Sequence, residues 1–135
     1  MSELLIKADT ANLSDVIGFI DGILEENDCH MKAQMQIDIA VEEMFVNVAH
    51  YAYTPDEGDV LITCNVENGS AAITLTDSGT PYDPLKKPDP DITLSAEERQ
   101  VGGLGIFMVK KSMDSVAYEY KDGKNIFTMT KQIGM

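Results

Sequence analysis

The sequence predicts an α+β domain of two layers, in which a largely antiparallel sheet of about five strands carries three helices on one face. Three segments have apolar residues at helical spacing, and about five short segments read as strands. Tight-turn sequences separate successive strands, at Asn68-Gly69 and at Lys121-Asp122-Gly123-Lys124. Because hairpins pair strands antiparallel and helices must bury an apolar side, we expect the helices to cover one face of the sheet.

The first half of the chain contains one strand and two helices. Residues 3–8 predict a short strand. A helix begins near Leu13, with Asn12 or Ser14 as its cap, and a longer helix runs from about Met31 to Tyr51. The turn sequence at residues 54–58 ends it. The apolar face of the first helix consists of Val16, Ile17, Ile20, Ile23 and Leu24.

The second half predicts two hairpins around a helix. Strands at residues 60–66 and 71–76 flank the Asn68-Gly69 turn, and strands at residues 115–120 and 125–131 follow a helix over about 106–113. Between them, the polar stretch at about residues 82–102 is longer than an ordinary connection, which favours a functional lid. We interpret residues 1–135 as a single domain.

Charge and composition exclude several functions. The formal net charge is −13, and Arg99 is the single arginine, so the protein should repel nucleic acid and anionic membranes. A phosphate ligand would need a metal ion and backbone N–H groups to hold it. The N-terminus lacks signal-peptide features, no segment is apolar enough to span a bilayer, and Cys29 and Cys64 are expected to be reduced. These features predict a soluble cytoplasmic protein.

Glu43 and Asn47 form the first candidate site. They are four residues apart and therefore share one face of the second helix. A carboxylate beside an amide oxygen suits Mg²⁺, or a water or hydroxyl to be activated. The alternative is a solvated helix face on which Asp38, Glu42 and Glu43 are simply exposed.

Asp77 and Gly79 form the second candidate site, at a strand end. Such an aspartate can accept a hydrogen bond from an exocyclic amine such as that of adenine, and Gly79 permits close approach of a flat base. The alternative is an Asx turn, which Asp and Gly form in many proteins.

The third candidate site is Gly102-Gly103-Leu104-Gly105, at the start of a helix. Glycine N–H groups and the positive helix end can hold phosphates without lysines. The alternative is a hinge for the preceding stretch.

The order of the three sites resembles the GHKL ATPase superfamily, which includes histidine kinases, DNA gyrase, mismatch-repair ATPases and heat-shock chaperones. Residues 47–53 and 102–107 look most like its branch of anti-sigma-factor serine kinases. The resemblance covers nearly the whole chain and implies the Bergerat ATP-binding fold. The segment Asp77-Ser78-Gly79-Thr80-Pro81 departs from the superfamily pattern D-x-G-x-G, in a form that is familiar among the small anti-sigma kinases.

The resemblance implies roles for individual residues. Glu43 would be the catalytic base, and Asn47 would ligate Mg²⁺ on the ATP phosphates. Asp77 would bind the adenine amine, with Gly79 lining the base pocket. The phosphates would be held by the loop of Gly103, Leu104 and Gly105, and Arg99 would neutralise the transferred phosphoryl group. For contact with adenine, Thr128 and Thr130 remain candidates in the last strand, and neither is assigned.

The resemblance also implies partners. The protein would be an ATP- and Mg²⁺-dependent serine kinase that phosphorylates an anti-anti-sigma protein of the STAS type and binds a sigma factor. The resemblance also implies a homodimer. The alternative is a non-catalytic interaction module whose partner binding ATP controls.

Overall fold

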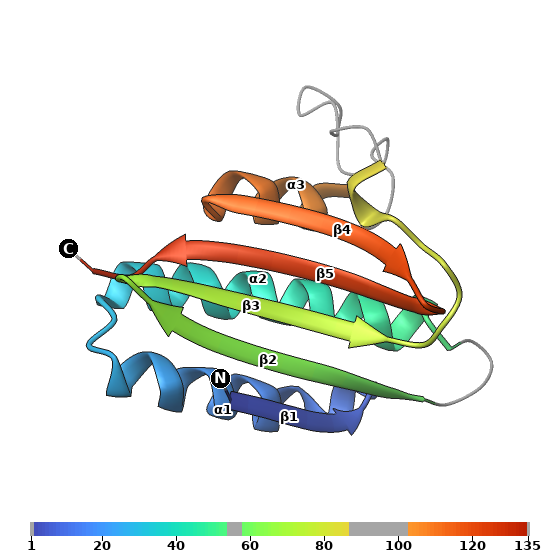
Figure 1. Ribbon diagram of the computed structural model, residues 1–135, viewed down its shortest axis with the longest axis horizontal. Coiled ribbons are helices and arrows are strands. Elements are labelled where there is room, and N and C mark those ends of the chain that lie inside the picture. Colours follow the sequence, from blue (N-terminus) through green and yellow to red (C-terminus); the bar gives the residue numbers. More distant parts are fainter. Residues whose placement is uncertain (1, 54–57, 87–102, 135) are drawn as a thin grey trace.

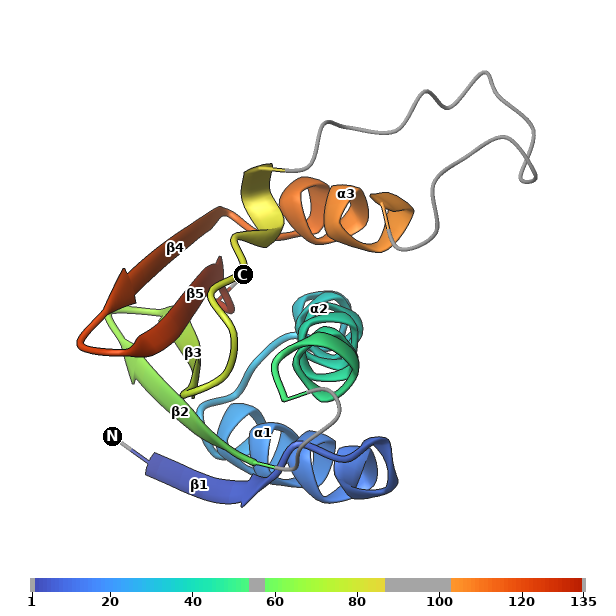
Figure 2. The ribbon, with the colours of Figure 1, turned by 90° about the vertical axis from the view of Figure 1, so that its right-hand side faces the viewer.

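The computed structural model describes residues 2–53, 58–86 and 103–134. These residues form two layers, with a five-stranded sheet on one side and three helices on the other (Figures 1 and 2). The helices α1, α2 and α3 lie side by side across one face of the sheet, and α2 is the middle one (Figure 2). The predicted α+β architecture is confirmed.

The sheet is antiparallel throughout, in the order β1-β2-β3-β5-β4. Its strands are β1 (Ser2–Lys7), β2 (Asp59–Glu67), β3 (Ser70–Asp77), β4 (Ser115–Lys121) and β5 (Lys124–Gln132). Asn68 and Gly69 both adopt positive φ, at 53° and 76°, as the tight turn between β2 and β3 requires. The register of β3 with β5 pairs Asp77 with Asn125, which brings two polar residues from distant parts of the sequence together.

The helices are α1 (Leu13–Glu26), α2 (Met31–Tyr51) and α3 (Gly103–Ser112), with short 3-10 helices at Thr10–Asn12 and Pro84–Lys86. His30 caps α2, because its Nδ1 accepts a hydrogen bond from the N–H of Ala33 at 3.2 Å. No helix in the described part of the chain is long and apolar enough to cross a membrane.

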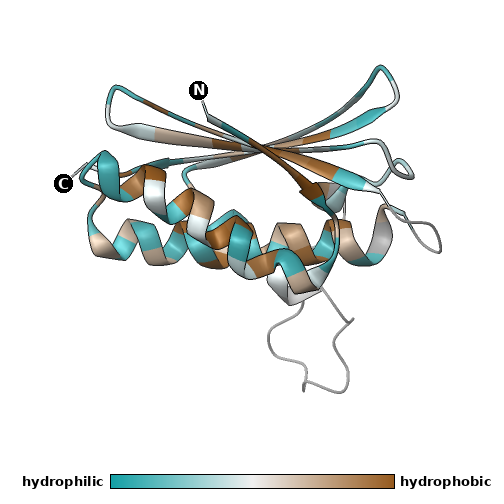
Figure 3. Ribbon diagram, turned by 90° about the horizontal axis from the view of Figure 1, so that it is seen from below, coloured by the Kyte–Doolittle hydropathy of each residue, from teal (hydrophilic) through white to brown (hydrophobic). Residues whose placement is uncertain are grey.

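The core lies between the helices and the sheet, where the inward residues of alternating strands meet the apolar helix faces. Phe45 of α2, Ile62 of β2 and Ile73 of β3 are fully buried at its centre. Hydrophobic segments of the strands and helices face each other across the two layers (Figure 3). This packing fixes α2 against the end of β3, where the candidate site lies.

One detail of the sequence prediction is wrong, and a second is confirmed only in part. Helix α3 begins at Gly103, not near Ile106, so Gly103 and Gly105 lie inside its first turn. Asn12 stands at the N-cap position of α1, but its side chain makes no capping bond and donates instead to the carbonyl of Lys7 at 3.1 Å. The side chain of Asp9 caps the preceding 3-10 helix. This added turn provides hydrogen-bond partners for the backbone before α1 begins.

Candidate functional site

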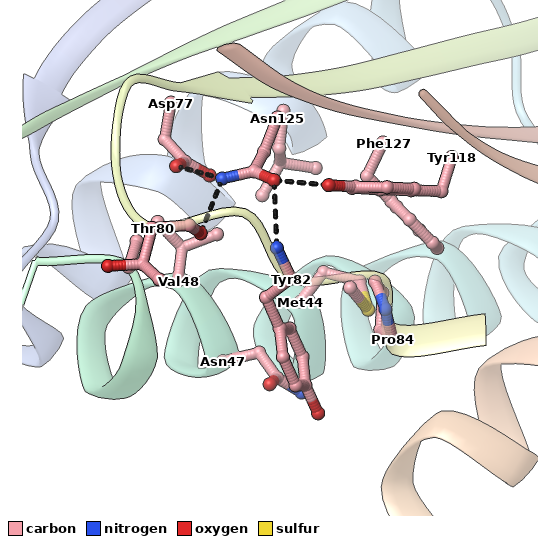
Figure 4. A pocket seen from close by; sticks show the side chains of 12 residues that line it. Met44, Asn47, Val48, Asp77, Thr80, Tyr82, Pro84, Tyr118, Asn125 and Phe127 are labelled. Carbon is pink, nitrogen blue, oxygen red and sulfur yellow. Dashed lines mark hydrogen bonds between the residues drawn. The ribbon is translucent and has the colours of Figure 1, made fainter. Parts of the chain in front are cut away.

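A pocket opens between the middle helix α2 and the ends of β3 and β5. It encloses about 430 Å³ of empty space, part of it open to solvent. Most of its lining is apolar, with a few polar groups, which is the usual composition of a small-molecule site. Figure 4 shows Asp77 and Asn125 on one side of the pocket and Asn47 of α2 on the other. Its lining includes Met44, Asn47, Val48, Leu75, Asp77, Thr80, Tyr82, Tyr118, Asn125 and Phe127.

Asp77 stands at the end of β3 and is 6% exposed. Its Oδ1 accepts two hydrogen bonds of 2.9 Å, from the N–H of Gly79 and from Nδ2 of Asn125. The first of these is an Asx-turn bond, so the turn proposed as the alternative is present. The same carboxylate also lines the pocket, so the turn and a ligand-binding role are compatible.

Gly79 is required by a close approach between two backbones. A Cβ on Gly79 would lie 2.2 Å from the carbonyl oxygen of Ala52, just beyond α2. That carbonyl accepts a hydrogen bond of 2.8 Å from the N–H of Thr80. The loop after β3 is therefore fixed to the end of α2, and the two walls of the pocket are held at a constant separation.

Asn47 projects from α2 into the pocket (Figure 4). Its Oδ1 is buried and has no hydrogen-bond partner within the described residues. A buried amide oxygen without a partner costs free energy unless a ligand satisfies it. This atom therefore fits the hard cation that the sequence prediction assigned to it.

Glu43 lies one helical turn before Asn47 on α2 and does not line the pocket. Burial raises the pKa of its carboxyl above the ordinary value, and the charge on Glu42 adds to this effect. The first turn of α3 packs directly against it, because a Cβ on Gly105 would lie 1.8 Å from Oε1 of Glu43. The structure thus brings two predicted sites, 62 positions apart in the sequence, into contact.

Among the described residues, Asn47 and Asp77 line the pocket, whereas Gly79 is not part of its lining and lies next to it, bonded to Asp77. Glu43 lies in contact with Gly105. Gly103 begins α3. Arg99, most of the predicted lid and the side chain of Leu104 lie outside the described part of the chain.

Sequence reasoning missed Asn125, which is 6% exposed and lines the pocket. The two unassigned candidates in the last strand, Thr128 and Thr130, alternate with the inward-facing Phe127 and Met129. Thr128 bonds to Thr74, and Thr130 bonds to Ser115, across neighbouring strands. A polar residue beside a turn, in an otherwise alternating strand, was the available signal for Asn125.

The sequence matches a known family over almost its whole length. The family described as histidine kinase-like ATPase domain matches residues 6–131. This chain belongs to the histidine kinase-like ATPase family. The resemblance that the order of the three motifs predicts is confirmed.

Among curated relatives in this family, the chain is similar to the serine/threonine-protein kinase BtrW of Bordetella bronchiseptica, with 24% identity over 129 residues, covering 95% of this chain and 89% of BtrW. It is also similar to the serine-protein kinase RsbW of Listeria monocytogenes, with 27% identity over 119 residues, covering 84% of this chain and 75% of RsbW.

Solved structures of histidine kinase-like ATPase domains share the fold. The structure of the RsbU and RsbW domains of a Mycobacterium tuberculosis protein has a TM-score of 0.69 at 14% identity, over 98% of this chain and 33% of that one. The histidine kinase domain of a blue-light-activated kinase from Erythrobacter litoralis has a TM-score of 0.58 at 16% identity, over 90% of this chain and 61% of that one.

Proposed function

We propose that this protein is an ATP-dependent serine kinase that acts as an anti-sigma factor. The observation that supports this most directly is the pocket itself, which has a buried carboxylate, Asp77, on one side and an amide oxygen without a partner, Asn47, on the other. One group suits a base amine and the other suits a cation on phosphates. The relatives named as serine kinases, BtrW and RsbW, support the choice of reaction.

The adenine would lie against Asp77. A carboxylate at the end of a mostly apolar pocket accepts a hydrogen bond from the exocyclic amine, while Met44, Leu75 and Phe127 offer apolar surface to the ring. Gly79 keeps the loop close to α2, so the pocket stays narrow enough for a flat ring.

The phosphates would lie between Asn47 and the start of α3. The N–H groups in the first turn of α3, which contains Gly103 and Gly105, supply positive charge without lysines. Within the described residues no group of three or more His, Cys, Asp and Glu side chains is placed to hold a metal. Asn47 Oδ1 would hold Mg²⁺, which would neutralise charge on the phosphates.

Glu43 would act as the general base. Its carboxylate accepts the proton of the partner's serine hydroxyl as that oxygen bonds to the γ-phosphorus, and ADP leaves with the bridging oxygen. Because burial raises the pKa of Glu43, its carboxylate is more basic than an exposed one. That suits it to accepting a proton near neutral pH.

A protein substrate is supported by an apolar row on α2. Met31, Met35 and Ile39 are 78%, 59% and 55% exposed, and they are spaced four residues apart along the helix that continues to Glu43. Exposed apolar rows of this kind are typical of protein-binding surfaces. The resemblance to the anti-sigma-factor serine kinases implies that the substrate is an anti-anti-sigma protein of the STAS type. It implies a sigma factor as the second partner.

Incubation with radiolabelled ATP, Mg²⁺ and STAS-type proteins of the source organism tests the proposal. We expect label on a serine of one of them, and no label with Glu43→Gln. If ATP binds but no labelled phosphoryl group is transferred to any of these proteins, the proposed kinase activity is refuted. If ATP then still changed partner binding in wild type and in Glu43→Gln alike, the protein would be an ATP-controlled interaction module.

A further inference from the structure

The side chain of Asn125 connects four parts of the site. Its Nδ2 donates to Oδ1 of Asp77 and to the carbonyl of Thr80, both at 2.9 Å, with a longer contact of 3.5 Å to the carbonyl of Gly79. Its Oδ1 accepts from the N–H of Tyr82 at 3.1 Å and from the hydroxyl of Tyr118. Figure 4 shows this network at one side of the pocket.

The backbone of Tyr82 determines the orientation of the amide. A backbone N–H can only donate, so the atom of Asn125 that faces Tyr82 must be the oxygen. The NH₂ group must then face Oδ1 of Asp77 and the carbonyl of Thr80, and a carbonyl oxygen can only accept. Both N–H groups and both acceptor positions of the amide are used, so no rotation of Asn125 satisfies the site equally well.

This arrangement acts on Asp77. Both hydrogen bonds described for its carboxylate end on Oδ1, from Gly79 and from Asn125. Two N–H donors on one oxygen fix the plane of the carboxylate. The other oxygen, Oδ2, is left as an acceptor for a ligand.

An acceptor of fixed position distinguishes two purine bases. Adenine presents an amine at its six position, which can donate to Oδ2. Guanine presents a carbonyl there, which would face a carboxylate without a proton between them. Sites built on hydrogen bonds discriminate strongly against ligands that leave a buried polar group unpaired.

We infer that Asn125 is a positioning residue that fixes the orientation of the Asp77 carboxylate, with Oδ2 as its acceptor for the base, and thereby sets the preference for adenine over guanine. The inference rests on the proposed nucleotide site. Tyr118 lies on β4, the strand that pairs with β5, and its hydroxyl holds the side-chain amide of Asn125 by donating to Oδ1.

Asn125→Asp provides the sharpest test, because it keeps the shape and exchanges one NH₂ group for an oxygen. That oxygen would face Oδ1 of Asp77 and the carbonyl of Thr80, which are all acceptors. A single proton between the two carboxyls would restore one bond. MgATP affinity, measured by calorimetric titration, should therefore fall about tenfold or more at pH 8 and recover toward the wild-type value near pH 5, after correction for the wild-type pH profile.

Base preference is measured by competition of MgGTP with MgATP. Asn125→Ala should reduce the preference for ATP about tenfold, because the Asp77 carboxylate loses the hydrogen bond from Asn125 and is then free to rotate. Tyr118→Phe, on an edge strand and with the N–H of Tyr82 still in place, should give a smaller reduction of a few-fold, and it provides the test if Asn125→Ala does not fold.

The possible outcomes separate the two proposals. If the wild-type protein does not bind MgATP, the proposed nucleotide site is refuted. If it binds, and Asn125→Asp either binds as wild type at all pH values or is weakened equally at all of them, Asn125 does not act through Asp77. An unchanged ATP preference in Asn125→Ala, or in Tyr118→Phe if that variant replaces it, would also overturn the inference.

Discussion

A Cβ atom on Gly105 would lie 1.8 Å from Oε1 of Glu43, so the first turn of α3 and the carboxylate of α2 occupy adjoining space. While the Glu43 carboxylate keeps this position, only a residue without a side chain fits at position 105. Through this contact the proposed phosphate-binding turn is adjacent to the proposed base.

Gly105→Ala should therefore displace the carboxylate of Glu43 without unfolding the protein. The atom that must move is the end of a flexible side chain, and alanine is a better helix former than glycine. We expect the free energy of unfolding to stay within about 1 kcal/mol of wild type, while phosphate transfer falls roughly 100-fold. Urea unfolding and a transfer assay with the partner measure the two effects.

Gly18→Ala is the matched control for that change. Gly18 lies in α1, and an added Cβ meets nothing within 4 Å. It should stabilise the protein by about 1 kcal/mol and leave transfer unchanged. Equal transfer by Gly105→Ala and Gly18→Ala would show that the contact with Glu43 has no role in catalysis.

Gly79→Ala should behave differently, because its Cβ would lie 2.2 Å from a backbone atom, the carbonyl oxygen of Ala52. A backbone cannot move aside as a side chain can. We expect a loss of about 1–3 kcal/mol in the free energy of unfolding, together with weaker nucleotide binding, since the loop leaves α2. Unchanged urea midpoints would contradict the close packing of this loop.

Transfer should depend on pH through Glu43. A base must be deprotonated, so the rate should fall as the pH falls through the pKa of Glu43, which burial and the charge of Glu42 raise above 4.5. Glu42→Gln removes the second cause and should move this acid limb of the pH–rate profile to lower pH. If the acid limb of the pH–rate profile is the same in Glu42→Gln as in wild type, a group other than Glu43 controls the rate.

A second pH effect should appear in stability. Burial, the neighbouring Asp21 carboxyl and the charge of Glu25 raise the pKa of Asp38 to about 7. Since the folded-state pKa lies above the unfolded value, protonated Asp38 stabilises the fold at low pH, and this stabilisation is lost as the pH rises through about 7.

Asp38→Asn should therefore lose less stability than wild type between pH 5 and pH 8, and at pH 8 it should exceed wild type by about 1 kcal/mol after solvent screening. Urea unfolding at the two pH values measures the difference. Glu26→Gln, an exposed change in the last turn of α1, is the control. Parallel pH profiles for wild type and Asp38→Asn would refute the effect.

Local patterns predict most of this fold because each element is specified by its own residues. Asn68-Gly69 identifies the β2–β3 turn, and the spacing of Val16, Ile20 and Leu24 identifies the buried face of α1. The sequence places the start of α3 too late because glycine has a poor helix propensity, whereas in the structure Gly105 packs against Glu43 in the first turn of α3.

The site was predictable only in part. Glu43, Asn47, Asp77 and Gly79 belong to short motifs, and the structure places them around or beside one pocket. Asn125 has no motif. Its role depends on the register that pairs it with Asp77 across β3 and β5, and strand order is not encoded in either segment alone.

Thermal unfolding with and without MgATP, in wild type and in Asp77→Asn, tests the central claim most directly. Asparagine at position 77 can still accept the bonds of Gly79 and Asn125, but it turns an NH₂ group toward the amine of adenine. At roughly 100 times its Kd, MgATP should stabilise the wild type by about 2.7 kcal/mol, and much less in the variant. Absence of a shift in wild type at millimolar MgATP, or equal shifts in both proteins, would contradict the account.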